Sequence, residues 1–282
     1  MNTENFATET STRISVQEIV VRYHPNQEPV LDRLSLQILP HKLNVLIGPN
    51  GCGKSTLLKA MARQLRLSSG AVFIEDRNIN SFSALELSQY VGILFQENFA
   101  PNDLTVEELI YYSRYPRLKL FESLREEDYH AVQWAMEITN TLRWRDRMIR
   151  ELSSGQRQLV WIALIIAQES KCLFLDEPTS YLDMANQIEI LDCIHRLNRE
   201  MGKTIVVSIH DLNMAAQYAD WIFAMKDGRI HSFGAPQNII TSELLHEVFD
   251  VEAKIIYDQQ DGAVYCIPKH VGYSSESVAR RE

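Results

Sequence analysis

The chain has 282 residues, of which 45% are hydrophobic, and a formal net charge of −9. This size and composition suit one globular domain or two small ones, with a core large enough to need no disulfide or structural metal. The acidic balance argues against a sequence-independent nucleic-acid binder, which needs an excess of Lys and Arg to neutralise phosphates. We therefore expect no nucleic-acid partner.

The apolar runs and the cysteines indicate where the protein works. No apolar run approaches the roughly 18 residues that cross a bilayer. The polar N-terminal segment has neither the basic region nor the apolar region of a secretion signal. The four cysteines are scattered without metal-ligand spacing, which is typical of reduced thiols. These features predict a soluble protein of the reducing cytoplasm.

The first part of the chain predicts strands that lead into a glycine loop. Residues 14–23 and 30–38 alternate apolar and polar side chains, which predicts an antiparallel pair with one buried face. Residues 45–47 predict a short buried strand, and residues 55–65 have apolar side chains at helical spacing. Another short strand is predicted at residues 91–95.

Residues 97–158 predict a helical subdomain inserted into the α/β core. Charged residues increase there, and apolar positions recur at helical spacing. Two capping boxes are predicted, Thr105 with Glu108 and Ser123 with Glu126.

The chain after the insert predicts a second α/β unit. An apolar helix is predicted at residues 156–168 and another helix at 184–200, with buried strands at Cys172–Leu175 and Thr204–Ser208. Buried strands that alternate with helices indicate a parallel sheet, and ligands of such sheets bind at the carboxyl ends of the strands.

A glycine-rich loop follows the strand at 45–47 and fits the phosphate-binding pattern GxxxxGK[ST]. Its residues are Gly48, Pro49, Asn50, Gly51, Cys52, Gly53, Lys54 and Ser55. The glycines let backbone N–H groups surround a phosphate, and the start of the helix adds its positive end. Lys54 supplies a full charge to the terminal phosphates, and Ser55 is positioned to coordinate Mg²⁺. A tight glycine turn without a ligand is the alternative.

Two adjacent carboxylates, Asp176 and Glu177, end the strand that begins at Cys172. Burying both without a cation is costly. With a phosphate loop upstream, Asp176 is a candidate Mg²⁺ ligand and Glu177 a candidate group to orient or deprotonate an attacking water. The alternative is a strand end that faces solvent.

Serines and a glycine precede the apolar helix, in the order Ser153, Ser154, Gly155 and Gln156. Such a helix start offers N–H groups and a hydroxyl to an anion. An ordinary helix cap is the alternative, and the local sequence does not say that this segment and the phosphate loop share one nucleotide.

Together these segments resemble the ATP-binding cassette (ABC) ATPases over residues 14–268. Residues 48–55 match the Walker A motif, residues 172–177 the Walker B strand, and residues 152–156 the signature normally written LSGGQ. The resemblance implies a P-loop NTPase fold of the α/β class, with a mainly parallel core sheet, an N-terminal antiparallel β subdomain and an inserted helical subdomain. It places the domain at residues 13–268, between tails at 1–12 and 269–282 that we expect to be disordered because they are polar.

The same resemblance assigns roles to single residues. Gln96 corresponds to the Q-loop glutamine, which joins Mg²⁺ and the attacking water to the groove for the membrane partner. Asp183 lies in the D-loop, and His210 corresponds to the switch histidine that contacts the γ-phosphate. Tyr23 corresponds to the aromatic residue that stacks on adenine, and Thr56 extends the ATP-binding set. Taken singly, Tyr23 could simply cap the sheet edge, and Gln96 and His210 could be plain polar residues at strand ends.

Two positions stand out against the family pattern. Ser154 replaces the first glycine of the signature and adds a side chain where the backbone approaches a phosphate. Cys52 lies at a position that varies in the family. Because it is at a helix N-terminus, we expect a lowered thiol pKa and ready alkylation.

The resemblance implies a chain that hydrolyses MgATP while two copies pair head to tail, each nucleotide lying between Walker A of one copy and the Ser153 segment of the other. A cassette without a membrane segment is expected to work with separate polytopic permease subunits at the cytoplasmic face of the inner membrane. A periplasmic or surface substrate-binding protein is then an indirect partner.

The transported substrate is narrowed by three segments, residues 210–220, 114–116 and 248–251, which look like those of ferric-siderophore importer ATPases. Import of an iron chelate is therefore the favoured function. Cobalamin and haem importers share much of this pattern and remain alternatives. A soluble ABC ATPase without a transport role, for example in iron–sulfur assembly, is the alternative from another class.

Overall fold

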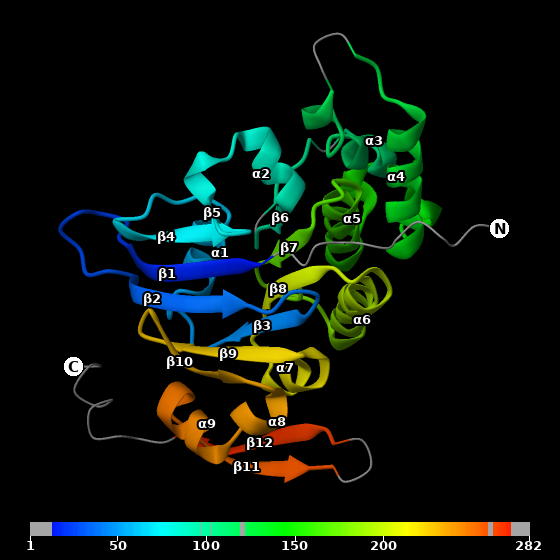
Figure 1. Ribbon diagram of the computed structural model, residues 1–282. Helices are drawn as coiled ribbons and strands as arrows, with labels where there is room; N and C mark the ends of the chain where they lie inside the picture. Colours follow the sequence, from blue (N-terminus) through cyan, green and yellow to red (C-terminus); the bar gives the residue numbers. More distant parts are fainter. Residues whose placement is uncertain (1–12, 97, 102, 119–121, 259–261, 272–282) are drawn as a thin grey trace.

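The computed structural model describes residues 13–271 apart from 97, 102, 119–121 and 259–261. The predicted tail at residues 1–12 lies outside the described residues, as do residues 272–282. Among the described residues there are three sheets, and the two-stranded sheet near the C-terminus lies at the lower end of the view, opposite a group of helices at the upper right (Figure 1).

The largest sheet has six strands and forms the centre of the protein, as predicted. Its strands, in spatial order, are β10 (Arg229–Gly234), β9 (Trp221–Lys226), β3 (Leu43–Ile47), β8 (Thr204–Ser208), β7 (Cys172–Leu175) and β6 (Val91–Leu94). All neighbours are parallel except β10, which pairs antiparallel with β9 at one edge. The strands β3, β7 and β8 are buried at every residue, which explains their continuous apolar runs.

A second, antiparallel sheet is built from the start of the chain, and this prediction is also confirmed. Its order is β2 (Leu31–Ile38), β1 (Ile14–Val21), β4 (Ser69–Ile74) and β5 (Arg77–Asn78). Helix α1 (Lys54–Met61) packs its apolar side chains into the core that this sheet shares with the central sheet. It ends at Met61 rather than at residue 65, because Arg63 adopts a left-handed conformation with φ 57°.

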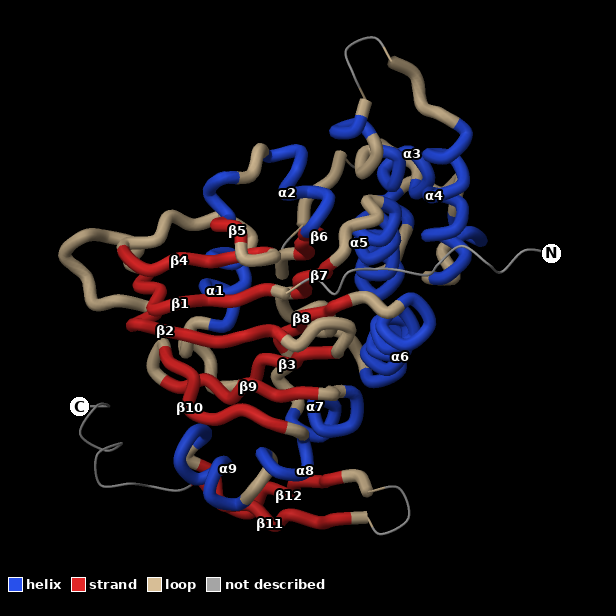
Figure 2. Tube along the Cα trace, in the orientation of Figure 1, coloured by secondary structure: helices blue, strands red, loops and turns tan. Residues whose placement is uncertain are grey.

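The helical subdomain lies at one end of the central sheet (Figure 2). After α2 (Ala84–Tyr90) and β6, it contains α3 (Val106–Tyr111), α4 (Glu126–Ile138) and α5 (Ser154–Ala167). The predicted capping box of Thr105 and Glu108 is confirmed. The predicted box of Ser123 and Glu126 is wrong. Helix α4 begins only at Glu126, so the residue at its third position is Asp128, which accepts a hydrogen bond from the Arg125 amide at 2.9 Å.

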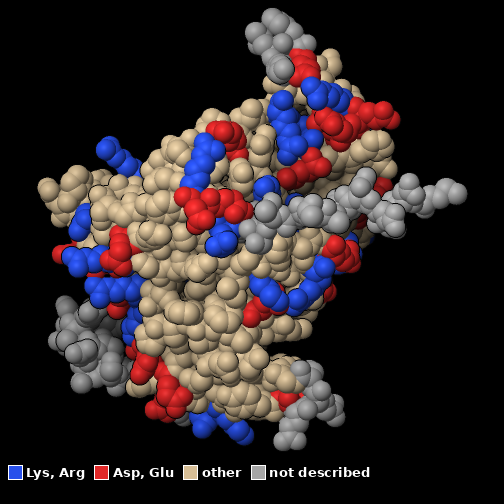
Figure 3. Space-filling view, viewed as in Figure 1, with Lys and Arg blue, Asp and Glu red and all other residues tan. Residues whose placement is uncertain are grey.

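Within this subdomain, a buried arginine joins α4 to the C-terminal end of α5. Arg114 is 2% exposed and donates to Asp128 Oδ1 at 2.7 Å and to the Ala167 carbonyl at 2.6 Å. It also contacts the half-exposed Glu169 at 2.7 Å. Other charges of the subdomain form ion pairs at the surface, where basic and acidic side chains lie side by side (Figure 3), as between Arg145 and Glu107 at 2.8 Å.

The rest of the chain forms the helices beside the sheet and a small C-terminal unit. Its elements are α6 (Met184–Met201), α7 (Leu212–Tyr218), α8 (Pro236–Ile239), α9 (Ser242–Phe249), β11 (Val251–Tyr257) and β12 (Val264–Val271). The last two strands form an antiparallel hairpin, so the domain end that we expected at residue 268 falls inside β12. Among the described residues, no helix is long and apolar enough to span a bilayer.

Candidate active site

The phosphate loop connects the buried strand β3 to α1, as the sequence predicts. Gly48 has φ 150°, and a Cβ there would lie 2.3 Å from the Met225 carbonyl oxygen of β9. Gly53 immediately precedes the helix with φ 104°, a left-handed conformation. Both positions therefore require glycine, and the loop is held close against the sheet.

The ammonium group of Lys54 lies inside the loop. Its Nζ donates to the Gly48 carbonyl at 2.8 Å and to the Pro49 carbonyl at 3.1 Å, and the residue is 4% exposed. Main-chain oxygens thus solvate the charge at the concave side of the loop, where it can exchange them for anionic oxygens.

Cys52 lies in the same loop, and our expectation about its thiol is wrong. The residue is buried, with its Sγ 4.0 Å from Lys54 Nζ. Burial disfavours the thiolate more than the nearby Lys54 charge favours it, so the pKa of Cys52 is raised rather than lowered. All four cysteines are buried free thiols.

Asp176 connects the end of β7 to the first turn of α1. Its Oδ1 accepts hydrogen bonds from Ser55 Oγ at 2.9 Å and from Ser208 Oγ at 3.0 Å. Burial raises the pKa of this carboxyl, although the two hydroxyl donors oppose the shift. A buried carboxylate and a hydroxyl 2.9 Å apart, beside a phosphate-binding loop, form the hard-oxygen set that Mg²⁺ prefers, so the residues fit this ion.

Glu177 is the point at which several predicted residues meet. Its Oε2 accepts hydrogen bonds from Gln96 Nε2 and Ser180 Oγ, both at 2.9 Å, and its Oε1 lies 2.5 Å from His210 Nε2. The Glu177 amide donates to Ser208 Oγ at 2.8 Å, and the residue has φ 49°. Such a left-handed non-glycine residue is rare, and here three side chains and a backbone bond hold it in place.

A cavity of about 530 Å³ joins this carboxylate to the phosphate loop. Its walls include Asn50 and Gly51 of the loop together with Gln96, Glu177 and His210. The structure thus brings together, within one space, residues that the sequence separates by more than a hundred positions.

Tyr23 and Thr56 lie together at the first turn of α1. The Tyr23 hydroxyl is 3.0 Å from Thr56 Oγ1, and 52% of Tyr23 is exposed. The ring is therefore anchored at one end beside the helix that follows the phosphate loop, with much of its surface open to a ligand.

The signature segment is not brought to the cavity within one chain. Ser153 caps α5 and forms a capping box with Gln156, while Ser154 is exposed in the first turn. Gly155 is buried, and a Cβ there would lie 2.7 Å from the Asn186 side chain. None of the four residues from Ser153 to Gln156 borders the described cavity.

Asp183 likewise does not border the cavity; it caps α6 and accepts a hydrogen bond from the Asn186 amide at 3.0 Å.

One residue of the site, Ser208, was not predicted from the sequence. Its hydroxyl contacts both the Asp176 carboxylate and the Glu177 amide, and it is completely buried. A signal was present, because Ser208 ends an apolar strand whose neighbour in the parallel sheet ends in two carboxylates.

Comparison with known proteins identifies the family. Residues 31–180 match the model described as ABC transporter. The iron(3+)-hydroxamate import ATP-binding protein FhuC of Bacillus subtilis (strain 168) is 40% identical over 90% of this chain and 94% of its own length. The ferric enterobactin transport ATP-binding protein FepC of Escherichia coli (strain K12) is 37% identical over 96% of this chain and 99% of its own.

Solved structures agree with this result. One is described as an inward-facing conformation of a putative metal-chelate type ABC transporter. It has a TM-score of 0.79 and 26% identity, and the match covers 92% of this chain and 98% of that one. A dimeric structure of the bacterial ABC transporter cassette MJ0796 has a TM-score of 0.69 and 25% identity, over 79% and 98% of the two chains. The matched motif region, the close relatives and the shared fold lead to one conclusion: this chain belongs to the ABC transporter family.

Proposed function

We propose that this chain is the ATPase subunit of an importer, and that it hydrolyses MgATP to drive uptake of an iron chelate through separate permease subunits. The observation that carries the catalytic part is the Glu177 carboxylate, held by Gln96 and His210 in a cavity that also borders the phosphate loop. A carboxylate in that position can orient and deprotonate the water that attacks the terminal phosphate.

The binding roles follow from the geometry of the loop. Lys54 and the loop amides hold the β- and γ-phosphates, and Tyr23 stacks on adenine beside Thr56. Ser55, Asp176 and Gln96 would hold Mg²⁺, which when bound neutralises charge on the phosphate oxygens. His210, which contacts Glu177, stabilises negative charge on the γ-phosphoryl group.

The signature segment acts on a second copy of the chain. Because Ser153–Gln156 do not border the cavity of their own chain, they are free to approach the nucleotide of a partner in a head-to-tail dimer. The dimeric state of the related cassette supports this arrangement. Ser154 is small and exposed at the helix start, and Ser153 and Gly155 retain the family residues, so we expect the segment to keep its affinity for phosphate. Asp183 contributes to the same interface.

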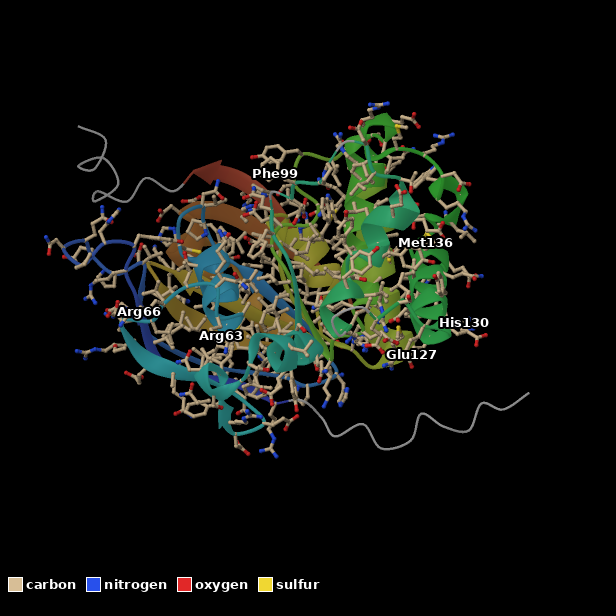
Figure 4. The ribbon with its side chains drawn as sticks, turned by 90° about the horizontal axis from the view of Figure 1, so that it is seen from above. Arg63, Arg66, Phe99, Glu127, His130 and Met136 are labelled. Atoms are coloured by element: carbon tan, nitrogen blue, oxygen red, sulfur yellow. The ribbon has the colours of Figure 1, made fainter. Side chains whose placement is uncertain are left out.

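The transport role is supported by the relatives, which are named for import of iron(3+)-hydroxamate and for transport of ferric enterobactin. The chain would then be held at the cytoplasmic face of the membrane by its permease, with a substrate-binding protein outside. Phe99 offers an apolar contact for such a partner: it is 88% exposed and projects from the ribbon beside the helical subdomain (Figure 4).

Glu177→Gln tests the catalytic assignment. The amide keeps the shape of the side chain but cannot accept a proton from water, so we expect kcat to fall at least about 100-fold, with ATP binding retained and a closed dimer accumulating. Glu243→Gln, at an exposed position in α9, is the matched control and should leave kcat unchanged. A normal hydrolysis rate in Glu177→Gln would show that another group is the base.

Uptake tests the transport assignment. A strain that lacks this chain is complemented with the native gene or with Glu177→Gln and given labelled ferric hydroxamate, ferric catecholate, haem or cobalamin. Restoration of iron-chelate uptake by the native chain alone supports the proposal, and restoration of only haem or cobalamin uptake corrects the substrate. Unchanged uptake in every case, with a purely soluble partner after detergent extraction, would favour an ABC ATPase without a transport role.

A further inference from the structure

The C-terminal hairpin is joined to the segment that follows His210 by one side chain. The Asn213 amide nitrogen Nδ2 donates to the Cys266 carbonyl at 3.2 Å, and the Cys266 amide donates to Asn213 Oδ1 at 2.7 Å. Asn213 therefore makes with β12 the pair of bonds that a residue of a neighbouring strand would make. In the described part of the chain, β11 and β12 form a two-stranded sheet that pairs with no other strand. The Asn213 side chain therefore supplies hydrogen bonds to β12 that a third strand would otherwise supply.

The hairpin itself is firmly seated. Along β12, Val264 and Cys266 are buried in the main core, whereas Tyr265 and Ile267 face outward. One face of the hairpin thus packs on the body of the protein, which gives Asn213 a fixed partner.

The segment that Asn213 joins to β12 borders the cavity on its other side. His210 is followed at once by Asp211, which caps α7 by accepting hydrogen bonds from the amides of Asn213 at 2.8 Å and Met214 at 2.9 Å. His210, Asp211 and Met214 border the cavity, while the Asn213 side chain binds the hairpin. The first turn of α7 is consequently held between the cavity and β12.

We propose that Asn213 is a positioning residue for hydrolysis, and that its two bonds to β12 fix the first turn of α7 so that His210 stays against Glu177. This inference rests on the proposed role of His210. Without the bonds, the turn keeps its Asp211 cap but loses its lateral support, and the imidazole samples positions away from the γ-phosphoryl group. Misplacement of a charge-stabilising group lowers kcat more than it changes substrate affinity.

The experiment measures kcat, KM for ATP and the unfolding temperature of the full-length chain. In Asn213→Ala we expect kcat to fall about 2- to 30-fold, with KM changed less than about twofold. Asn213→Asp keeps the acceptor for the Cys266 amide but loses the donor, so it should fall between the native chain and Asn213→Ala.

Ser242→Ala is the matched control, because the Ser242 hydroxyl also binds the hairpin, at the Ala253 carbonyl of β11 at 3.3 Å, but from α9. It should leave kcat unchanged. If both alanine variants only lower the unfolding temperature and leave kcat of the folded fraction intact, Asn213 is merely structural and the inference is overturned.

A double-variant cycle with His210→Ala separates this inference from the proposed function. If Asn213 acts through His210, Asn213→Ala should lower kcat little further once His210 is absent. If His210→Ala lowers kcat and Asn213→Ala multiplies the loss by its full factor, the positioning role fails while the proposed function stands. If His210→Ala itself leaves kcat unchanged, the assigned role of His210 fails, and the inference fails with it.

Discussion

The buried Arg114 allows a quantitative test of what holds the helical subdomain together. Arg114→Ala leaves the Asp128 carboxylate, whose side chain is 4% exposed, without its guanidinium partner at 2.7 Å, and it leaves the Ala167 carbonyl without a donor. Removing one partner of a buried ion pair typically costs about 3–5 kcal/mol. The contact with Glu169 adds little, because that carboxylate is half exposed and screened by water.

This loss can be measured by thermal and urea unfolding. A cost of that size should lower the unfolding temperature by roughly 6–20 °C, at about 2–4 °C per kcal/mol for a domain of this size. Arg145→Ala is the control in the same subdomain. Arg145 is half exposed, with Glu107 at 2.8 Å, and its loss should cost no more than about 1 kcal/mol.

A third variant distinguishes the cost of leaving a buried charge unpaired from the cost of losing side-chain packing. Arg114→Met with Asp128→Leu removes both charges and keeps apolar volume, so it should be more stable than Arg114→Ala alone. If Arg114→Ala costs no more than Arg145→Ala, or if the double variant is the least stable of the three, the unpaired Asp128 charge does not explain the loss of stability.

Three further predictions concern groups elsewhere in the fold. Burial raises the pKa of Cys172 and of Cys193 to about 12, so iodoacetamide at pH 8 should label neither thiol until the chain is unfolded, as read by mass spectrometry. Burial alone would raise the pKa of Asp128, but hydrogen bonds from the Arg125 amide and Arg114 lower it overall. Asp128→Asn should therefore destabilise the chain most at neutral pH, and the difference in urea midpoint should shrink as the pH falls below about 4. Gly48→Ala places a methyl 2.3 Å from a carbonyl oxygen of β9, so binding of a fluorescent ATP analogue should be lost; binding at native affinity would show that the loop can move away from the sheet.

The sequence predicted the strands and the motifs well, because their signals are local. The buried strands Cys172–Leu175 and Thr204–Ser208 have the bounds expected from their apolar runs. The Thr105 capping box was predictable for the same reason, since every interaction in it lies within four residues. The meeting of Gln96 and His210 at Glu177 was not visible locally and followed only from the family resemblance.

The failures came from properties that depend on tertiary packing. Ser123 and Glu126 have the spacing of a capping box, but the helix begins later, where Asp128 is tied to Arg114 and the Arg125 amide. The Cys52 thiol is at a helix N-terminus, yet burial outweighs that position and raises its pKa. The sequence pattern shows where a helix begins, but it does not show which residues from elsewhere in the chain pack there and exclude water.

The pairing of β7 with β8 has a consequence for how this protein can change over evolutionary time. Leu175 lies opposite Val207 in the parallel register, and the next residues along the two strands are Asp176 and Ser208. Inserting or deleting one residue in either strand would turn its terminal side chains to the opposite face of the sheet. Length variation should therefore be absent from these two strands and concentrate in connections such as the one between α3 and α4, where an added residue shifts no reacting group.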